Sequence, residues 1–100
     1  MASELTKAAQ DVLAERQRQI STEGWSTAHD DEHRAGELAL AAGKYASAAA
    51  GWASAGQWPW EQEWWKPGTA RRMLVKAGAL ILAEIERLDR AAVKNGTGRQ

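Results

Sequence analysis

The chain contains no cysteine, which excludes disulfide frameworks, thiolate metal sites and cysteine nucleophiles. It also contains no phenylalanine and only two prolines in 100 residues. No segment approaches the roughly 20 consecutive apolar residues of a membrane span, and the N-terminus has no apolar signal-peptide core. Thirteen basic residues balance thirteen acidic ones, so the formal net charge is zero, which argues against a long nucleic acid as partner. We expect one cytoplasmic domain covering residues 1–100, with no membrane contact.

Three segments have the apolar spacing of amphipathic helices. Small and aliphatic residues recur every three or four positions over residues 4–22, about 31–50 and about 70–94. The third segment also repeats close to a heptad, which favours a homo-oligomer formed through that helix. No segment shows the alternation of a strand. The sequence therefore predicts an all-α domain of three helices.

Capping residues set the expected ends of these helices. Short polar side chains stand where each helix would begin, and glycines stand where the first two would end. The expected N-caps are Ser3, then Asp30 or Asp31, then Thr69, and the expected stops are Gly24, Gly51 and Asn95-Gly96. Residues 95–100 should form a frayed tail.

Residues 51–69 differ in composition from the rest of the chain. They hold five of the six tryptophans, together with three glycines and two prolines, so a continuous helix is excluded here. We expect a long tryptophan-rich loop between the second and third helices. Its tryptophans could supply core to the alanine-rich helices, line a ligand pocket or form a protein interface. The sequence leaves these three alternatives open.

A cationic cluster follows the loop. Arg71, Arg72 and Lys76 lie in the first turns of the third helix, where free backbone N–H groups and the helix dipole favour anions. Arginines beside aromatic rings can hold a phosphate while a ring stacks on a base. The aromatic candidates for this pocket are Trp25, Trp58, Trp60, Trp64 and Trp65. The alternative is that the two arginines form ion pairs with Glu61 and Glu63 of the loop.

Two further patterns suggest metal chemistry. His29, His33 and Glu37 are four residues apart, so one helix would place them on one face as ligands of a divalent metal. The alternative is a capped helix start with solvated histidines. Glu86 and Asp89 have the ExxD spacing that can hold Mg²⁺. This pair resembles half of the motif of MazG-like all-α nucleoside-triphosphate pyrophosphohydrolases, but the upstream ExxE half is missing.

From Ala14 to Arg90 the chain resembles a family of small phage and prophage proteins. The resemblance rests on Glu15-Arg16-Gln17, Glu23-Gly24-Trp25, His29-Asp30-Asp31, His33, Gly36-Glu37-Leu38-Ala39, Trp58-Pro59-Trp60, Trp64-Trp65-Lys66-Pro67 and the helix from Leu74 to Asp89. A more distant similarity is to the ryanodine-receptor repeat domain, through Gly24-Trp25, Asp30-Asp31, Pro59-Trp60 and Arg71-Arg72. The resemblance implies a protein of a bacterial host cell and, through the repeat domain, a nucleotide-derived ligand.

These observations favour a non-catalytic binding module. We expect it to hold a small nucleotide-like ligand in a pocket of tryptophans and arginines, with no cofactor, and to act as a sponge for a host immune signal. One alternative is a metal-dependent pyrophosphohydrolase that uses Glu37, Glu86 and Asp89 with His33 nearby. The other is an inhibitory or structural module that binds a protein through its tryptophan surface.

Overall fold

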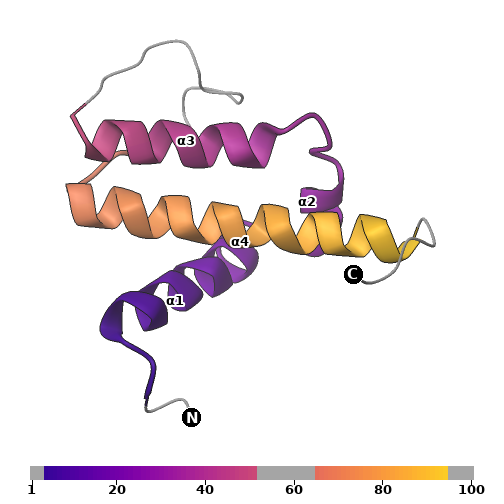
Figure 1. Ribbon diagram of the computed structural model, residues 1–100, viewed down its shortest axis with the longest axis horizontal. Coiled ribbons are helices and arrows are strands. Elements are labelled where there is room, and N and C mark those ends of the chain that lie inside the picture. Colours follow the sequence, from indigo (N-terminus) through magenta and orange to yellow (C-terminus); the bar gives the residue numbers. More distant parts are fainter. Residues whose placement is uncertain (1–3, 52–64, 95–100) are drawn as a thin grey trace.

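The computed structural model describes residues 4–51 and 65–94, and this part of the chain is mostly helical. Its helices are α1 (Lys7–Ser21), α2 (Thr27–Asp31), α3 (Glu37–Ala49) and α4 (Ala70–Lys94) (Figure 1). No strand occurs within the described residues, so the all-α prediction is confirmed, with four helices in place of three. None of the described helices combines the length and the apolar composition needed to cross a bilayer.

The predicted second helix is in fact two helices. Ser26 caps α2 through its hydroxyl, which accepts a hydrogen bond from the backbone N–H of His29 at 3.3 Å. Residues 32–36 then interrupt the helical path, and Gly36 has a φ of 91°, a conformation that favours glycine. The prediction that Asp30 or Asp31 caps the helix was wrong, because both residues lie inside α2.

The ends of α1 and α4 test the other caps. Helix α1 begins at Lys7 rather than at residue 4, since the Thr6 hydroxyl accepts a hydrogen bond from Ala9 N at 3.1 Å. The expected cap at Ser3, like the loop over residues 52–64 and the tail over 95–100, lies outside the described residues. Helix α4 begins after Thr69, whose hydroxyl accepts a hydrogen bond from Arg72 N at 3.1 Å, and ends at Lys94, as predicted.

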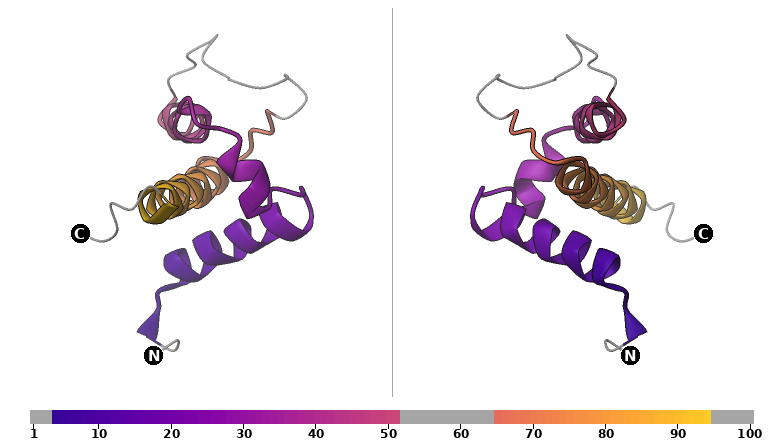
Figure 2. Two further views of the ribbon diagram at one scale, coloured as in Figure 1. Left: turned by 90° about the vertical axis from the view of Figure 1, so that its right-hand side faces the viewer. Right: turned by 90° about the vertical axis from the view of Figure 1, so that its left-hand side faces the viewer.

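Helix α4 is the centre of the fold. Helix α3 runs antiparallel along one side of it, while α1 crosses it on another side (Figure 1). The short helix α2 packs against α4 and links the other two (Figure 2). Every other described helix therefore contacts α4.

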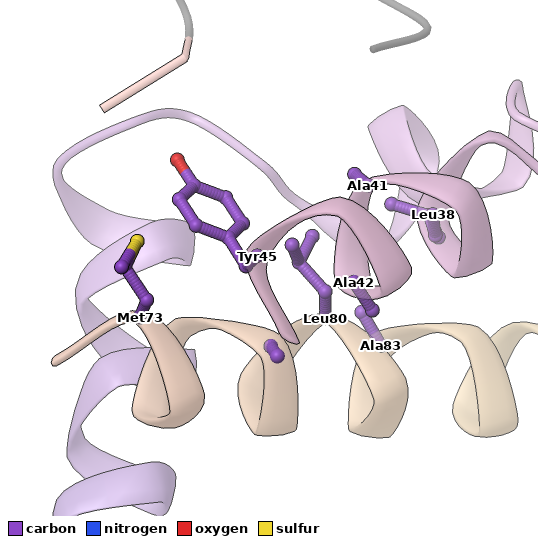
Figure 3. Packing of buried hydrophobic residues seen from close by; sticks show 8 residues of the cluster. Leu38, Ala41, Ala42, Tyr45, Met73, Leu80 and Ala83 are labelled. Carbon is purple, nitrogen blue, oxygen red and sulfur yellow. The ribbon is translucent and has the colours of Figure 1, made fainter. Parts of the chain in front are cut away.

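The apolar core lies between α3 and α4. Its members are small, apart from two leucines, a tyrosine and a methionine, and they interlock along the two helices (Figure 3). They are Leu38, Ala41, Ala42 and Tyr45 of α3 with Met73, Ala77, Leu80 and Ala83 of α4. The half-buried rings of Trp25 and Trp65 pack against this cluster. Of the tryptophans in residues 51–69, Trp65 thus contributes to the core, whereas Trp52, Trp58, Trp60 and Trp64 lie outside the described residues.

Candidate functional site

The face that α1 turns toward the rest of the molecule is charged. Glu15, Arg16 and Gln19 are the buried residues of this helix, and each is less than a tenth exposed. Buried ionised groups need partners, because an unpaired charge in a protein interior costs several kcal/mol. The structure provides these partners on α2 and α4.

Arg16 joins three helices. Its Nη2 donates to Oδ2 of Asp30 at 2.8 Å, and Asp30 on α2 is completely buried. The Nη2 and Nε of the same guanidinium also donate to Oε1 of Glu86 on α4, at 3.1 and 3.3 Å. One side chain therefore fixes the positions of α1, α2 and α4 relative to one another.

Glu15 is the second centre of the charged network. Its two carboxylate oxygens accept hydrogen bonds from Arg18 at 2.9 and 2.8 Å, from Gln19 at 3.2 Å and from Arg72 of α4. Burial alone would raise the pKa of Glu15, but the hydrogen bonds and charges of Arg18 and Arg72 outweigh it and lower the pKa below its usual value. Glu15 is therefore a fixed anion that orients two arginines.

The predicted arginine pair lies beside a hollow between α1 and the first turns of α4. The hollow has a volume of about 420 Å³, which is within the range of small-molecule sites. Arg71 Nη1 lies 2.9 Å from Asp11 Oδ2, and Arg72 is bound to Glu15. The described partners of Arg71 and Arg72 thus come from α1, whereas the expected partners Glu61 and Glu63 lie outside the described residues.

Lys76 occupies a smaller hollow that shares Glu15 and Arg18 with the first. Its ammonium donates to the Lys66 carbonyl at 2.8 Å and lies 5.6 Å from the centre of the Tyr45 ring. Burial, followed by the charge of Arg72, lowers the pKa of Lys76. Lys76 is therefore held close to the arginine pair, as the sequence suggested.

The structure describes two of the five tryptophans predicted to line the pocket. The ring of Trp25 stacks on His29 at 5.6 Å, with the two planes 2° apart, and also lines the smaller hollow. The ring of Trp65 packs on Tyr45 at 4.6 Å, and the ammonium of Lys44 lies 5.2 Å from its centre. Trp58, Trp60 and Trp64 lie outside the described residues. The structure therefore brings Trp25 near the cationic cluster, and Trp65 next to Tyr45.

Cations outnumber anions around the two adjoining hollows. The residues that line them include five basic side chains and three carboxylates, which leaves an excess of two positive charges: Arg18, Lys66, Arg71, Arg72 and Lys76 against Asp11, Glu15 and Glu23. The chain as a whole has no net charge. This local excess makes the region attractive to an anion.

The structure brings together some of the metal ligands predicted from the His29, His33 and Glu37 spacing. Nε2 of His29 and Nε2 of His33 are 3.2 Å apart, and Nδ1 of His29 lies 3.1 Å from Oδ1 of Asp30. Glu37 Oε2 lies 3.9 Å from His33 Nδ1, the ring nitrogen that faces away from His29. Across residues 4–51 and 65–94, no group of three or more His, Asp or Glu side chains could hold a metal ion.

The two carboxylates of the predicted ExxD pattern on α4 have different surroundings. Glu86 accepts two hydrogen bonds from Arg16, while Asp89 is exposed. Magnesium is commonly held by one or two carboxylates together with water and substrate phosphate, and here Arg16 already occupies Oε1 of Glu86. The geometry gives the pyrophosphohydrolase alternative no support.

No protein-family model matches the chain, and no curated protein or solved structure matches it significantly. The resemblance to phage proteins and to the ryanodine-receptor repeat therefore stays a prediction.

The charged network around Arg16 and Glu15 was not predicted from the sequence. Periodicity places Arg16 among the apolar residues of α1, which was the available signal that this arginine points inward. The partners of a buried arginine depend on how helices cross, and periodicity does not give that. Asp30 was treated as a cap, although it is the completely buried partner of Arg16.

Proposed function

We propose that this chain is a small non-catalytic module that binds a phosphorylated, nucleotide-like ligand in the hollow between α1 and the first turns of α4. The observation that carries the proposal is the excess of positive charge around an open hollow of about 420 Å³. A phosphate there would meet Arg71 and Arg72 as well as the N-terminal end of a 25-residue helix.

The ion pairs of the two arginines differ in a way that suits ligand exchange. The pair of Arg71 with Asp11 is exposed, and such pairs contribute little to stability, so a phosphate could replace Asp11 at low cost. Glu15 is buried and stays in place, which keeps Arg72 aimed at the hollow although its side chain is 43% exposed. One arginine is thus held in position and the other is free to turn toward a ligand.

A second cationic hollow lies at the opposite end of α4 and is a weaker candidate. It has a volume of about 300 Å³ and is lined by Asp31, Arg34, Arg87, Arg90, Ala91 and Lys94. The C-terminal carbonyls of α4 give this end a negative potential, so basic side chains are favourable there without any ligand. We therefore assign the phosphate to the N-terminal end.

The ligand's base would stack on tryptophan. Trp25 is the described tryptophan that lines the smaller hollow with Lys76, and Trp58, Trp60, Trp64 and Trp65 are the other candidates proposed from the sequence. In a phage protein of a bacterial host, a module that binds and does no chemistry would act by sequestering a nucleotide signal of host immunity.

Calorimetric titration tests the proposal with a panel of mononucleotides, dinucleotides and cyclic dinucleotides. We expect one class to bind, and we expect Arg72→Ala to weaken that binding at least tenfold. Arg90→Ala is the matched control, because Arg90 has similar exposure and lies in the second hollow. Absence of binding across the panel would overturn the proposal, and equal losses in both variants would remove the assignment to this hollow.

A further inference from the structure

Helix α4 has a third face that no described helix covers. One side of α4 packs on α3 and another on α1, and no described helix lies along the side between them (Figure 2). Four large aliphatic residues of α4 are about half exposed. They are Leu74 at 54%, Ile81 at 48%, Ile85 at 49% and Leu88 at 51%. Exposed aliphatic side chains in a continuous row are typical of an interface rather than of a solvated surface.

The spacing of this row identifies the kind of partner. Leu74, Gly78, Ile81, Ile85, Leu88 and Ala92 follow one another at alternating intervals of four and three residues. This is the a/d pattern of a coiled coil, and the six positions, which we call the seam, span about 27 Å of α4. A seam of period 3.5 is complementary to another helix that carries the same repeat, so the partner is an α-helix.

The order of large and small residues along the seam makes it complementary to itself. If two copies of α4 run antiparallel with residue 81 facing residue 85, then Leu74 faces Ala92 and Leu88 faces Gly78. The Leu74–Ala92 layers then combine one large with one small side chain, the Leu88–Gly78 layers also include Val12 of α1, which lies over Gly78, and the central layers combine two isoleucines. In a parallel pair Ala92 would face Ala92 and leave a void, while Leu74 would face Leu74, and close packing disfavours such an uneven arrangement.

The rest of the fold leaves room for this arrangement. Val12 of α1 lies at the edge of the seam, since its methyl carbons are 3.2 Å from the position that a Cβ of residue 78 would take. It could share the outer layer with Leu88 of the second copy. Helices α1 and α3 occupy the other faces of α4, so neither covers the central isoleucines.

We propose that the protein forms a two-fold symmetric dimer in which α4 of each copy pairs antiparallel with α4 of the other, with Ile81 facing Ile85. The dimer is independent of the ligand proposed above, because the seam and the cationic hollow share no residue.

Sedimentation equilibrium at micromolar concentration provides the first test. We expect twice the mass of the chain, and we expect Ile85→Glu to weaken dimerisation at least tenfold while its circular dichroism stays unchanged. Val93→Glu is the matched control, because Val93 is 67% exposed on α4 but lies outside the seam. A wild-type chain that is monomeric at 100 micromolar would overturn the proposal and would indicate that the seam is covered by another part of the chain or by a different protein.

The absence of native cysteine allows a test of the register. In the antiparallel pair residue 74 of one copy lies opposite residue 92 of the other, whereas the two copies of residue 74 are about 27 Å apart. A mixture of Leu74→Cys and Ala92→Cys chains should therefore form the mixed disulfide on mild oxidation, and Leu74→Cys alone should stay reduced. A rapid homodisulfide of Leu74→Cys would show a parallel pair and overturn the register.

Discussion

The two covered sides of α4 are held by different physical interactions. Toward α3 the contact is apolar, made of leucine, methionine, tyrosine and alanines that exclude water. Toward α1 and α2 the contact includes charged groups: Arg16 is hydrogen-bonded to Asp30 and Glu86, and Glu15 is hydrogen-bonded to Arg72 of α4. The apolar side gains free energy from any well-packed set of side chains, whereas the charged side is stable only when every partner is present. The charged side is therefore the more sensitive to a single substitution.

Asp30→Ala should have the largest effect, because it leaves the Arg16 guanidinium buried without its completely buried partner. We expect the free energy of unfolding to fall by about 3–5 kcal/mol. Urea titration followed by tryptophan fluorescence measures this loss. Asp31→Ala is the control, since Asp31 pairs with Arg90 at the exposed surface, and it should change stability little. Equal losses in the two variants would contradict a buried network.

Replacing Arg16 and Asp30 together separates the effect of their charges from the effect of their packing. In Arg16→Met combined with Asp30→Leu, no buried charge of this pair remains, and most of the stability lost in Asp30→Ala should return. The measurement is again the midpoint of urea unfolding. A double variant as unstable as Asp30→Ala would show that the packing of these positions, rather than their charge, holds α1 in place.

Leu80→Ala tests the apolar side. Leu80 is completely buried between α3 and α4, so its truncation should lower the free energy of unfolding by about 2–5 kcal/mol through lost burial and a residual cavity. Leu40→Ala is the control, because Leu40 belongs to α3 but is 49% exposed. Thermal unfolding by circular dichroism separates the two variants, and similar midpoints for both would contradict the position of the core.

Acid should weaken the charged side selectively. The pKa of Glu15 is lowered in the folded protein, so its contribution is present above the ordinary value of 4.5 and is lost as the pH falls through the lowered value. We expect the urea concentration at the midpoint of wild-type unfolding to decrease as the pH is lowered below about 5. Glu15→Gln should be less stable than the wild type at pH 7 and should lose less on acidification. Identical pH profiles would exclude Glu15 as a fixed anion.

Alanine substitutions at two helix glycines test how closely neighbouring helices pack at those positions. A Cβ added at Gly43 of α3 would meet no described atom within 4 Å, so Gly43→Ala should raise stability by about 0.5–1 kcal/mol. At Gly78 the added Cβ would lie 3.2 Å from two methyl carbons of Val12, which opposes the same gain. Gly78→Ala should therefore be the less stable of the two variants in urea. A larger gain at Gly78 would show that α1 yields easily there.

Much of the fold could be predicted from the sequence. The helix from 70 to 94 was predicted with its Thr69 cap, because its apolar repeat is long and the preceding Pro67-Gly68 excludes an earlier start. The division between α2 and α3 was missed. A long alanine-rich stretch has high helix propensity, and the φ of Gly36 that breaks it depends on how α2 packs.

Of the residues in the candidate site, the main ones predicted from the sequence were the basic residues of α4. Arg71, Arg72 and Lys76 were found because a helix start marks them, but Asp11 and Glu15, which orient the arginines, belong to a helix about 60 residues away in the chain. Contacts at that separation follow from the crossing of α1 and α4. Periodicity shows which face of a helix is buried and not what that face meets.

The position of Arg16 has a consequence for how the molecule opens. Helix α1 is attached to α4 by the ion pairs of Arg16 with Glu86, Glu15 with Arg72 and Asp11 with Arg71, and by the close approach of Val12 to Gly78. Its amide protons should exchange with solvent through detachment of α1 as a unit, at a lower free energy than that required to separate α3 from α4. Helix α1 would thus detach from the charged side of α4 before the rest of the domain unfolds. A ligand that binds both α1 and α4 would slow that exchange.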